Sequence, residues 1–273
     1  MSTFKKQLRT IAASAVIALG VGAASNASAA PVFEVTPSSL LGVVSAPFNA
    51  DFINGGSSAL VTNTGGFTYA SDGYITYGQF TLAGNPVPFT GLGSSYGLYA
   101  TFHQTFSCGS LLSPGVTCTV NTISLSVFAD VWNGSILNVD TFAGATLLSA
   151  PTVTINGADT LLGTATLVNS GLAGINSLGG AFENVNTNFL LTAAGSAFFT
   201  QPIPFYELAF SNFNNTTQGI TCNTAGCVGA TIVAINSENG GTDFNRVPEP
   251  ATLALMGLGL LGLGASRRRK TSV

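Results

Sequence analysis

Ile123-Ser124-Leu125-Ser126-Val127 is the stretch of sequence that decides the fold. Apolar side chains alternate with hydroxyl side chains along it, and Ala129 and Val131 continue the apolar face. A period of two is the pattern of a β-strand with one buried face. The same alternation recurs at 98–103 and 206–210, whereas the sequence from 31 to 246 has almost no helical periodicity.

Turn-forming residues separate these alternating stretches. Glycine-containing breakers occur at 54–56, 65–66, 72–73, 84–86, 133–134 and 240–241, and Asn156-Gly157 predicts a hairpin turn after 152–155. At most one brief helix is expected, at 170–181. Strands of about 5–8 residues between close turns predict an all-β, antiparallel domain of the sandwich or barrel-like type. Of these we expect an antiparallel β-sandwich or jelly-roll-like domain, with a core that the Phe residues of this region can fill.

Charged residues are scarce and unevenly placed. They make up 7% of the 273 residues, against about a quarter in an ordinary soluble domain. Seven of the eight Lys and Arg residues lie in the first nine or the last seven positions. Between Ala30 and Val247 there are ten acidic residues and one cation, Arg246, which gives a net charge of −9. This excludes nucleic-acid binding and argues against a typical cytosolic enzyme.

The N-terminus has the order of a secretory signal peptide. Lys5, Lys6 and Arg9 are followed by an apolar run at 11–22 and by Ala27-Ser28-Ala29, which predicts cleavage by signal peptidase before Ala30. The alternative is an uncleaved anchor, but the apolar run is short for a span of ~20 residues. We therefore expect a signal peptide at 1–29 and an exported β-rich domain at 30–246.

The four cysteines form two pairs that are close in sequence. Cys108 lies near Cys118, and Cys222 lies near Cys227. An even number of closely spaced cysteines in an exported domain predicts two disulfides, although four cysteines permit three connectivities. A zinc site is not favoured, because neither spacing is C-x-x-C and His103 is the only histidine.

The segment 247–273 has three parts. Val247-Pro248-Glu249-Pro250 comes first, an apolar stretch rich in Leu, Gly and Ala follows at 251–265, and Arg267-Arg268-Arg269-Lys270 forms a basic stop. The apolar stretch predicts a transmembrane helix slightly shorter than usual. The positive-inside rule keeps the basic stop in the cytoplasm and places 30–247 outside. A plain anchor that is never cut is the alternative.

This order of parts resembles the PEP-CTERM sorting signal. The resemblance implies a substrate of an exosortase, a membrane transpeptidase whose own cysteine is the nucleophile, with cutting near Pro248-Glu249-Pro250. It implies export across the inner membrane, transient anchoring by the C-terminal helix, and delivery to the cell surface or extracellular matrix.

The mature N-terminal region is similar to the flocculation-associated PEP-CTERM proteins. The similarity rests on short strings at 33–37, 51–56, 77–80, 91–93 and 96–102, and it covers roughly 33–140. It implies a protein without enzymatic activity that promotes cell aggregation (flocculation, biofilm) together with exopolysaccharide or another cell-surface polymer. Thr, Ser and Asn on the outer faces suit neutral sugars, and weakly protected strand edges make self-association an option.

Two catalytic motifs fail their context tests. Gly93-Ser94-Ser95-Tyr96-Gly97 fits a nucleophile elbow, but His103 follows too closely and lies in the next expected strand. The G-x-G-x-x-G at 257–262 has no preceding strand and falls in the apolar stretch of the tail. We expect no catalytic residue, no cofactor and no metal.

Three alternatives stay open at this point. A carbohydrate-binding module would use exposed aromatic side chains such as Tyr96, Tyr99 or Trp132. A glycan hydrolase would need two of the acidic residues at a suitable separation; the candidates are Asp130, Asp140, Asp159, Glu183 and Glu207. An oxygen-rich loop made of Asn236, Glu238, Asn239 and Asp243 could bind calcium, although it lacks the EF-hand pattern.

Overall fold

The computed structural model describes residues 31–132, 135–215 and 219–245. The chain divides into two units, Met1–Pro31 and Val32–Val273, and every element described here belongs to the second. The predicted signal peptide therefore lies outside the described residues, as does the sorting segment.

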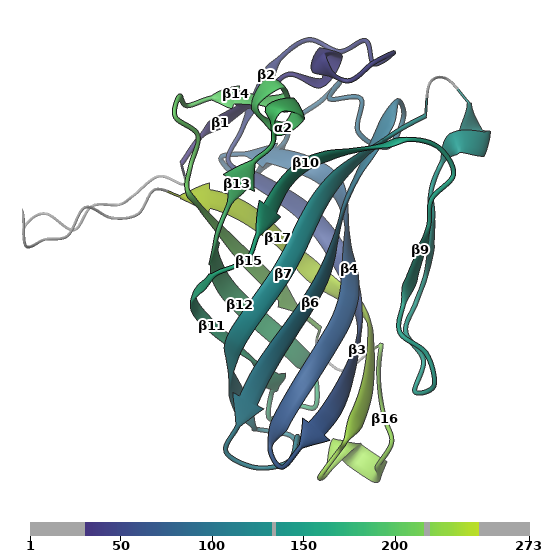
Figure 1. Ribbon diagram of the computed structural model, residues 1–273, viewed down its shortest axis with the longest axis vertical. Helices are drawn as coiled ribbons and strands as arrows, with labels where there is room; N and C mark the ends of the chain where they lie inside the picture. Colours follow the sequence, from purple (N-terminus) through teal and green to yellow (C-terminus); the bar gives the residue numbers. More distant parts are fainter. Residues whose placement is uncertain (1–30, 133–134, 216–218, 246–273) are drawn as a thin grey trace, which may run out of the picture. The chain divides into compact units, whose positions relative to one another are not determined.

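Eight antiparallel strands form a closed barrel (Figure 1). They follow one another around the wall in the order β11, β12, β15, β17, β3, β4, β6 and β7, and β7 pairs back with β11 to close the ring. Their bounds are β3 (Phe52–Gly65), β4 (Thr68–Leu82), β6 (Tyr96–Cys108), β7 (Thr117–Val131), β11 (Val168–Ile175), β12 (Ala181–Asn188), β15 (Leu208–Asn214) and β17 (Ile232–Asn245).

Short elements extend the barrel and cover one of its ends. A three-stranded sheet lies at that end together with the helix α2 (Figure 1). It consists of β1 (Phe33–Val35), β2 (Phe48–Ala50) and β14 (Phe199–Gln201). The remaining elements are η1 (Pro37–Ser39), β5 (Asn85–Pro86), η2 (Ile136–Asn138), β8 (Thr141–Ala143), β9 (Thr152–Thr154), β10 (Asp159–Ala165), β13 (Leu190–Leu191), α2 (Ala193–Phe198), β16 (Ile220–Cys222) and η3 (Ala225–Cys227).

The all-β, antiparallel prediction is confirmed, but the predicted sandwich or jelly-roll-like arrangement is wrong. Several of the expected breakers lie inside strands: 54–56 is within β3, 72–73 within β4, and 240–241 within β17. These strands are therefore 14 or 15 residues long. Long twisted strands with bulges coil strongly, and a coiled sheet can close on itself.

Glycine explains why such positions are strands and not turns. A Cβ atom on Gly73 would lie 2.4 Å from the Phe102 ring, so the missing side chain makes room for an aromatic neighbour inside the barrel. At the seam between β7 and β11, a Cβ atom on Gly174 would lie 2.2 Å from the carbonyl oxygen of Val116. The brief helix expected at 170–181 is wrong for the same reason, because its glycines let β11 approach β7.

The hairpin turn predicted at Asn156-Gly157 is also wrong. β9 pairs with the preceding β8 and not with the following β10. The backbone N–H of Asn156 instead donates to Asp140 Oδ1 at 2.7 Å, which fixes the approach of the chain to β10.

The barrel interior contains two apolar clusters with polar side chains between them. One cluster lies toward the end covered by β1, β14 and α2 and contains Phe33, Phe80 and Phe244. The other contains Tyr69, Phe106 and Val233. Each buried aromatic side chain removes a large apolar area from water, so these clusters supply most of the core.

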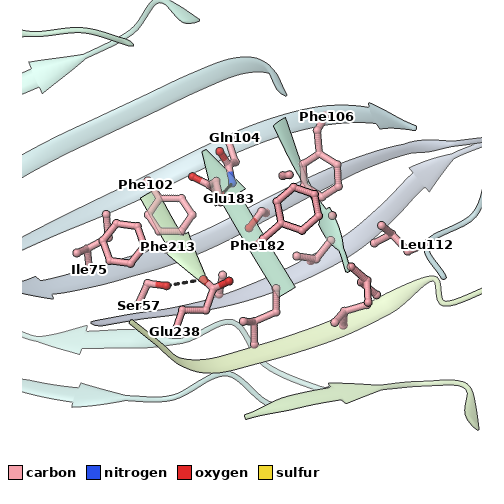
Figure 2. A pocket seen from close by; sticks show the side chains of 18 residues that line it. Ser57, Ile75, Phe102, Gln104, Phe106, Leu112, Phe182, Glu183, Phe213 and Glu238 are labelled. Atoms are coloured by element: carbon pink, nitrogen blue, oxygen red, sulfur yellow. Dashed lines mark hydrogen bonds between the residues drawn. The ribbon is translucent and has the colours of Figure 1, made fainter. Parts of the chain in front are cut away.

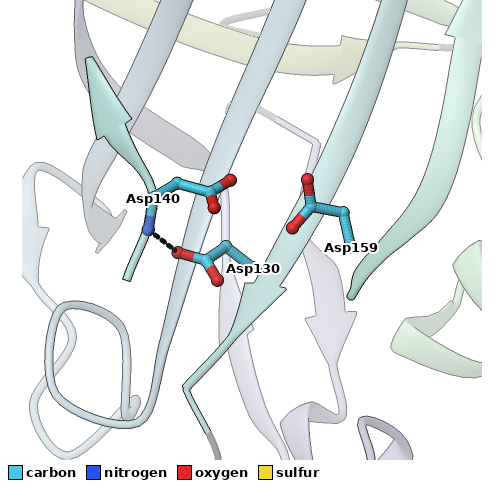
Figure 3. Close-up of side chains that lie close together, drawn as sticks. All are labelled: Asp130, Asp140 and Asp159. Carbon is cyan, nitrogen blue, oxygen red and sulfur yellow. Dashed lines mark hydrogen bonds between the residues drawn. The ribbon is translucent and has the colours of Figure 1, made fainter. Parts of the chain in front are cut away.

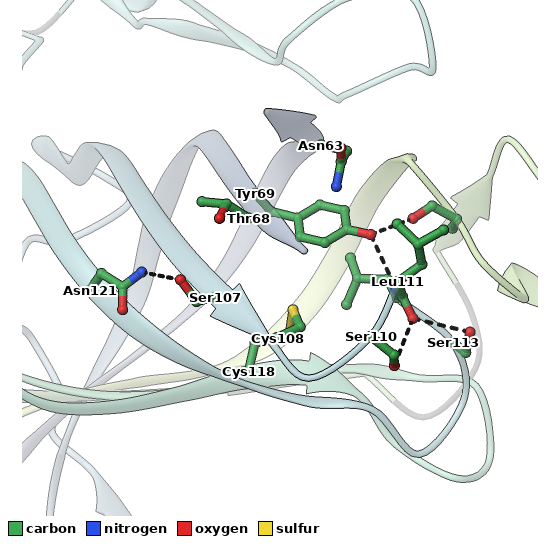
Figure 4. The surroundings of a disulfide bond; sticks show 12 residues. Asn63, Thr68, Tyr69, Ser107, Cys108, Ser110, Leu111, Ser113, Cys118 and Asn121 are labelled. Atoms are coloured by element: carbon green, nitrogen blue, oxygen red, sulfur yellow. Dashed lines mark hydrogen bonds between the residues drawn. A yellow bond between two sulfur atoms is a disulfide. The ribbon is translucent and has the colours of Figure 1, made fainter. Parts of the chain in front are cut away.

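Both disulfides pair the cysteines that are close in sequence, as predicted. Cys108 and Cys118 join the adjacent ends of β6 and β7 (Figure 4), and Cys222 joins Cys227. Beside the first disulfide, the Tyr69 hydroxyl accepts from the Leu112 N–H at 2.9 Å and donates to the Ala230 carbonyl at 2.8 Å. The loop after Cys108 is thus held by the disulfide and by the hydrogen bond from Leu112 to Tyr69.

Candidate functional site

Three aspartates meet at the root of the segment that connects β7 to β10 (Figure 3). Asp130 is near the end of β7, Asp159 is the first residue of β10, and the two are paired in the antiparallel register. Asp140 directly precedes β8. One carboxylate oxygen from each of the three lies within 4.8 Å of the others.

Hydrogen bonds hold all three carboxylates in place, since Asp140 Oδ1 accepts from the Asn156 N–H. Asp130 Oδ2 accepts from Trp132 Nε1 at 2.8 Å and from the Asp140 N–H at 3.0 Å. The Tyr99 hydroxyl donates to Asp159 Oδ2. The orientation of the carboxylates is therefore set by neighbouring groups and not by solvent.

The cluster also contains oxygens without a partner. Asp140 Oδ2 and Asp159 Oδ1 are both buried and accept no hydrogen bond. Such an oxygen costs free energy unless a proton, a donor or a cation neutralises it. The described residues include no Lys or Arg that could do so.

Burial and the neighbouring charges act on the titration of this cluster. Burial raises the pKa of Asp140 to about 6, the Asn156 N–H lowers it, and the negative charges of Asp130 and Asp159 raise it, as does a hydrogen bond with the Asp159 carboxyl when Asp140 is protonated. Burial and the bond to Asp159 also raise the pKa of the Tyr99 hydroxyl. Ionisation of all three aspartates is therefore unfavourable unless a positive charge lies nearby.

Two further acidic side chains lie inside the barrel (Figure 2). The Ser57 hydroxyl donates to Glu238 Oε2 at 2.6 Å, and Gln104 Nε2 donates to Glu183 Oε2. Burial raises the pKa of both carboxyls, that of Glu238 to about 7. The cavity beside them has a volume of about 40 Å³, which is room for a few water molecules and not for a sugar.

The nucleophile-elbow residues do not form a catalytic arrangement. Ser95 lies in a turn, where its N–H donates to the Gly91 carbonyl at 2.8 Å. His103 lies on the outer wall of β6, and its Nδ1 is 2.7 Å from Asp72 Oδ1. The imidazole is therefore engaged with a carboxylate on the neighbouring strand.

The structure corrects the aromatic residues suggested for sugar binding. Tyr96 and Tyr99 are 0% and 2% exposed, so neither ring offers a face to a ligand. Trp132 is partly buried and donates to Asp130. Of the three aromatic side chains suggested for sugar binding, only the indole ring of Trp132 is partly exposed.

The oxygen-rich loop suggested for calcium is a strand. All four of its residues lie in β17. Asn236 Oδ1 accepts from the Ser58 hydroxyl and the Ala145 N–H, and Glu238 is bonded to Ser57 inside the barrel. Their oxygens do not converge on one point, because successive side chains of a strand point to opposite faces.

The sequence named the members of the aspartate cluster but could not place them together. Only the pairing of β10 with β7 brings Asp159 beside Asp130, and only the return of the chain before β8 adds Asp140. Glu207, which was considered with them, is exposed and lies elsewhere, just before β15. Glu183, the fifth candidate, lies inside the barrel beside Gln104. No spacing rule in the sequence distinguishes the three that meet from the two that do not.

Comparison with known proteins identifies the C-terminal segment. Residues 246–270 match the PEP-CTERM protein-sorting motif. This motif marks an exported protein that an exosortase sorts to the cell surface. No curated protein and no solved structure matches the chain.

The individual residues of both targeting segments lie outside the described residues. These are the signal cleavage residues Ala27, Ala29 and Ala30, the motif residues 247–250, the apolar stretch 251–265 and the basic stop 267–270. In the part of the chain that is described, no helix has the length and apolar character needed to cross a membrane.

Proposed function

We propose that this protein is a surface or matrix protein without enzymatic activity that promotes cell aggregation together with exopolysaccharide. The observation that carries the proposal is the PEP-CTERM motif at 246–270, which marks an exported protein sorted by an exosortase. The role in aggregation, in flocs or biofilm, is supported by the short stretches of sequence at 33–102 that are similar to the flocculation-associated proteins. Processing by signal peptidase and by exosortase precedes that role.

The outer wall of the barrel supports contact with neutral polymers. Hydroxyl and amide side chains face each other across neighbouring strands, as in Thr105 with Thr122 at 2.7 Å and Asn121 with Ser107 at 2.7 Å. No Lys or Arg occurs among the described residues. Such a wall hydrogen-bonds sugars and water and repels polyanions.

Exposed apolar side chains support self-association as part of this role. Leu41, Val44 and Phe89 are 87%, 93% and 97% exposed. Their two loops are neighbours, since the Ser45 hydroxyl donates to the Phe89 carbonyl at 3.1 Å. Exposed apolar side chains grouped in this way favour contacts between proteins.

The two rival functions have less support. A carbohydrate-binding module would need a defined aromatic platform, and two of its three candidate rings are buried. A glycan hydrolase would need paired carboxylates at an open cleft. Asp130 and Asp140 are each 4% exposed, and Glu183 and Glu238 lie beside a cavity too small for a sugar.

Deletion of Pro248-Glu249-Pro250 tests the sorting step. We expect the deleted protein to stay in the inner-membrane fraction, whereas a control lacking Thr271-Ser272, beyond the matched residues, reaches the surface. Delivery of both proteins to the surface in equal amounts would contradict the sorting step.

Settling of cultures tests the aggregation role. Cells lacking the gene should settle more slowly and recover when the full-length gene returns, but not when the deleted form returns. Unchanged settling of the null strain would contradict the role. Titration of the protein with cell polysaccharide separates the alternatives, because a carbohydrate-binding module saturates with a simple stoichiometry.

A further inference from the structure

We propose that Asp130, Asp140 and Asp159 bind a calcium ion that fastens the β8–β9 segment to the barrel. This inference is independent of the proposed role in aggregation, because it rests on the geometry of three side chains.

The carboxylate oxygens of the cluster are close enough to share one ion. Three carboxylates from separate points of the chain converge, with one oxygen of each within 4.8 Å of the others (Figure 3). Oxygens bound to one cation at 2.3–2.6 Å are separated by distances up to about twice that length. The observed separation fits a shared ion without a change of fold.

Two buried carboxylate oxygens of the cluster lack a hydrogen-bond donor. Asp140 is 4% exposed, and its Oδ2 is buried without a hydrogen-bond partner. Asp159 Oδ1 is in the same condition. The other oxygens of these two residues accept from the Asn156 N–H and from the Tyr99 hydroxyl. The two free oxygens are therefore the positions at which a cation gains most.

The chemistry of the ligands selects the ion. The cluster contains carboxylates and neither histidine nor cysteine, so it suits a hard cation and not zinc or copper. Calcium accepts irregular geometry and six to eight oxygens, with water completing the shell, whereas magnesium demands a near-ideal octahedron. Extracellular calcium modules bind with dissociation constants of about 10⁻⁴–10⁻³ M, and the sorting motif places this domain outside the cell.

The location gives the ion a structural task. Asp130 and Asp159 belong to paired strands of the barrel region, whereas Asp140 belongs to the segment that leaves it. Farther along that segment, Phe142 packs against the rings of Tyr74 and Tyr99, with centroids 5.1 and 5.5 Å away. An ion at the root would add its bonds to these contacts and hold the segment on the outer wall.

Calcium titration of the full-length protein in detergent, after treatment with EDTA, tests the proposal. Trp132 is the only tryptophan and donates to Asp130, so its fluorescence reports on the site. We expect a saturable change in emission. At ten times the dissociation constant we expect a rise of about 3–6 °C in the unfolding temperature. Magnesium at the same concentration should produce a smaller rise.

Asp140→Asn is the decisive variant, and Asp72→Asn is its control. Asp140→Asn should weaken calcium binding at least tenfold. Without calcium, its unfolding temperature should be no lower than that of the wild type, because the substitution removes one of three negative charges that repel one another. Asp72, an exposed carboxylate paired with His103, should be replaceable with calcium binding unchanged.

Two results would overturn the proposal: a wild-type protein that gives no saturable response to calcium, and equal calcium affinity in Asp140→Asn and the wild type. A wild type indifferent to calcium, together with an Asp140→Asn protein of lower stability, would show that a shared proton, and not a metal, satisfies the cluster. If Asp140→Asn fails to fold, the affinity of Asp159→Asn decides, with the same expected loss.

Discussion

Replacement of Glu238 by Gln should remove much of the pH dependence of stability. Glu238 is 6% exposed inside the barrel, and burial raises its pKa from 4.5 to about 7, with the Ser57 bond lowering it and nearby Glu183 raising it. The folded protein therefore binds this proton more tightly than the unfolded chain. The stabilising effect is complete below pH 4.5 and is lost as the pH rises through about 7.

The size of the effect follows from the two pKa values. A difference of roughly 2.5 units at about 1.4 kcal/mol per unit gives a loss of about 3 kcal/mol between pH 4.5 and pH 8. A glutamine side chain has nearly the same volume, and its oxygen can still accept from the Ser57 hydroxyl. We expect Glu238→Gln to match the wild type within about 1 kcal/mol at pH 5 and to exceed it by about 2–3 kcal/mol at pH 8.

Urea unfolding at pH 5, 6, 7 and 8, followed by Trp132 fluorescence, measures this difference. Glu207→Gln, which makes the same substitution at an exposed position, is the matched control. Titrating groups far from Glu238 are common to both proteins, so their contributions cancel, whereas the coupling between Glu238 and Glu183 is lost in the variant and is part of the measured difference. The reasoning fails if Glu238→Gln retains the wild-type slope, or if the variant is less stable than the wild type at pH 8.

Two further predictions concern covalent and steric features of the wall. Replacing Cys108 and Cys118 by serine removes a disulfide between residues with a sequence separation of 10. In urea titrations without reductant, the free energy of unfolding should fall by about 2–3 kcal/mol. Equal unfolding midpoints for the variant and the wild type would contradict this. Gly174→Ala places a Cβ atom 2.2 Å from a backbone carbonyl oxygen at the β7–β11 seam. It should lower the free energy of unfolding by at least about 2 kcal/mol. Gly78→Ala is the control and should be about as stable as the wild type, because its Cβ atom meets nothing within 4 Å.

Local side-chain patterning was predictable from the sequence. The alternation at 123–131 gave both the strand and its buried face, since Ile123, Val127, Ala129 and Val131 are all buried in β7. The disulfide pairing was also favoured by spacing, because each pair lies within one hairpin or one turn. These features depend on residues that are near in sequence, where the geometry of one strand or turn is sufficient.

Closure of the sheet was not predictable, because it depends on which glycines bend the chain and which make room for a neighbour. Asp72-Gly73 and Gly240-Gly241 have turn composition, yet they lie in β4 and β17. A Cβ atom on Gly240 would lie 1.8 Å from the Asn212 carbonyl oxygen on β15, so here the glycine permits strand contact. Whether a glycine allows this close contact can be judged only when the neighbouring strand is known. A sandwich and a barrel differ in which strands are neighbours.

The placement of acidic side chains reveals how a domain without Lys or Arg among its described residues can bury negative charge. Inside the barrel, Glu183 and Glu238 accept from neutral donors, Gln104 and Ser57, and burial raises the pKa of both carboxyls, which favours their protonated forms. At the root of the β8–β9 segment, donors occupy only some of the carboxylate oxygens, and two buried ones stay free. A proton can satisfy one such oxygen, whereas a divalent cation can satisfy several at once. The interior group therefore links stability to pH, and the aspartate cluster links the attachment of one segment to calcium.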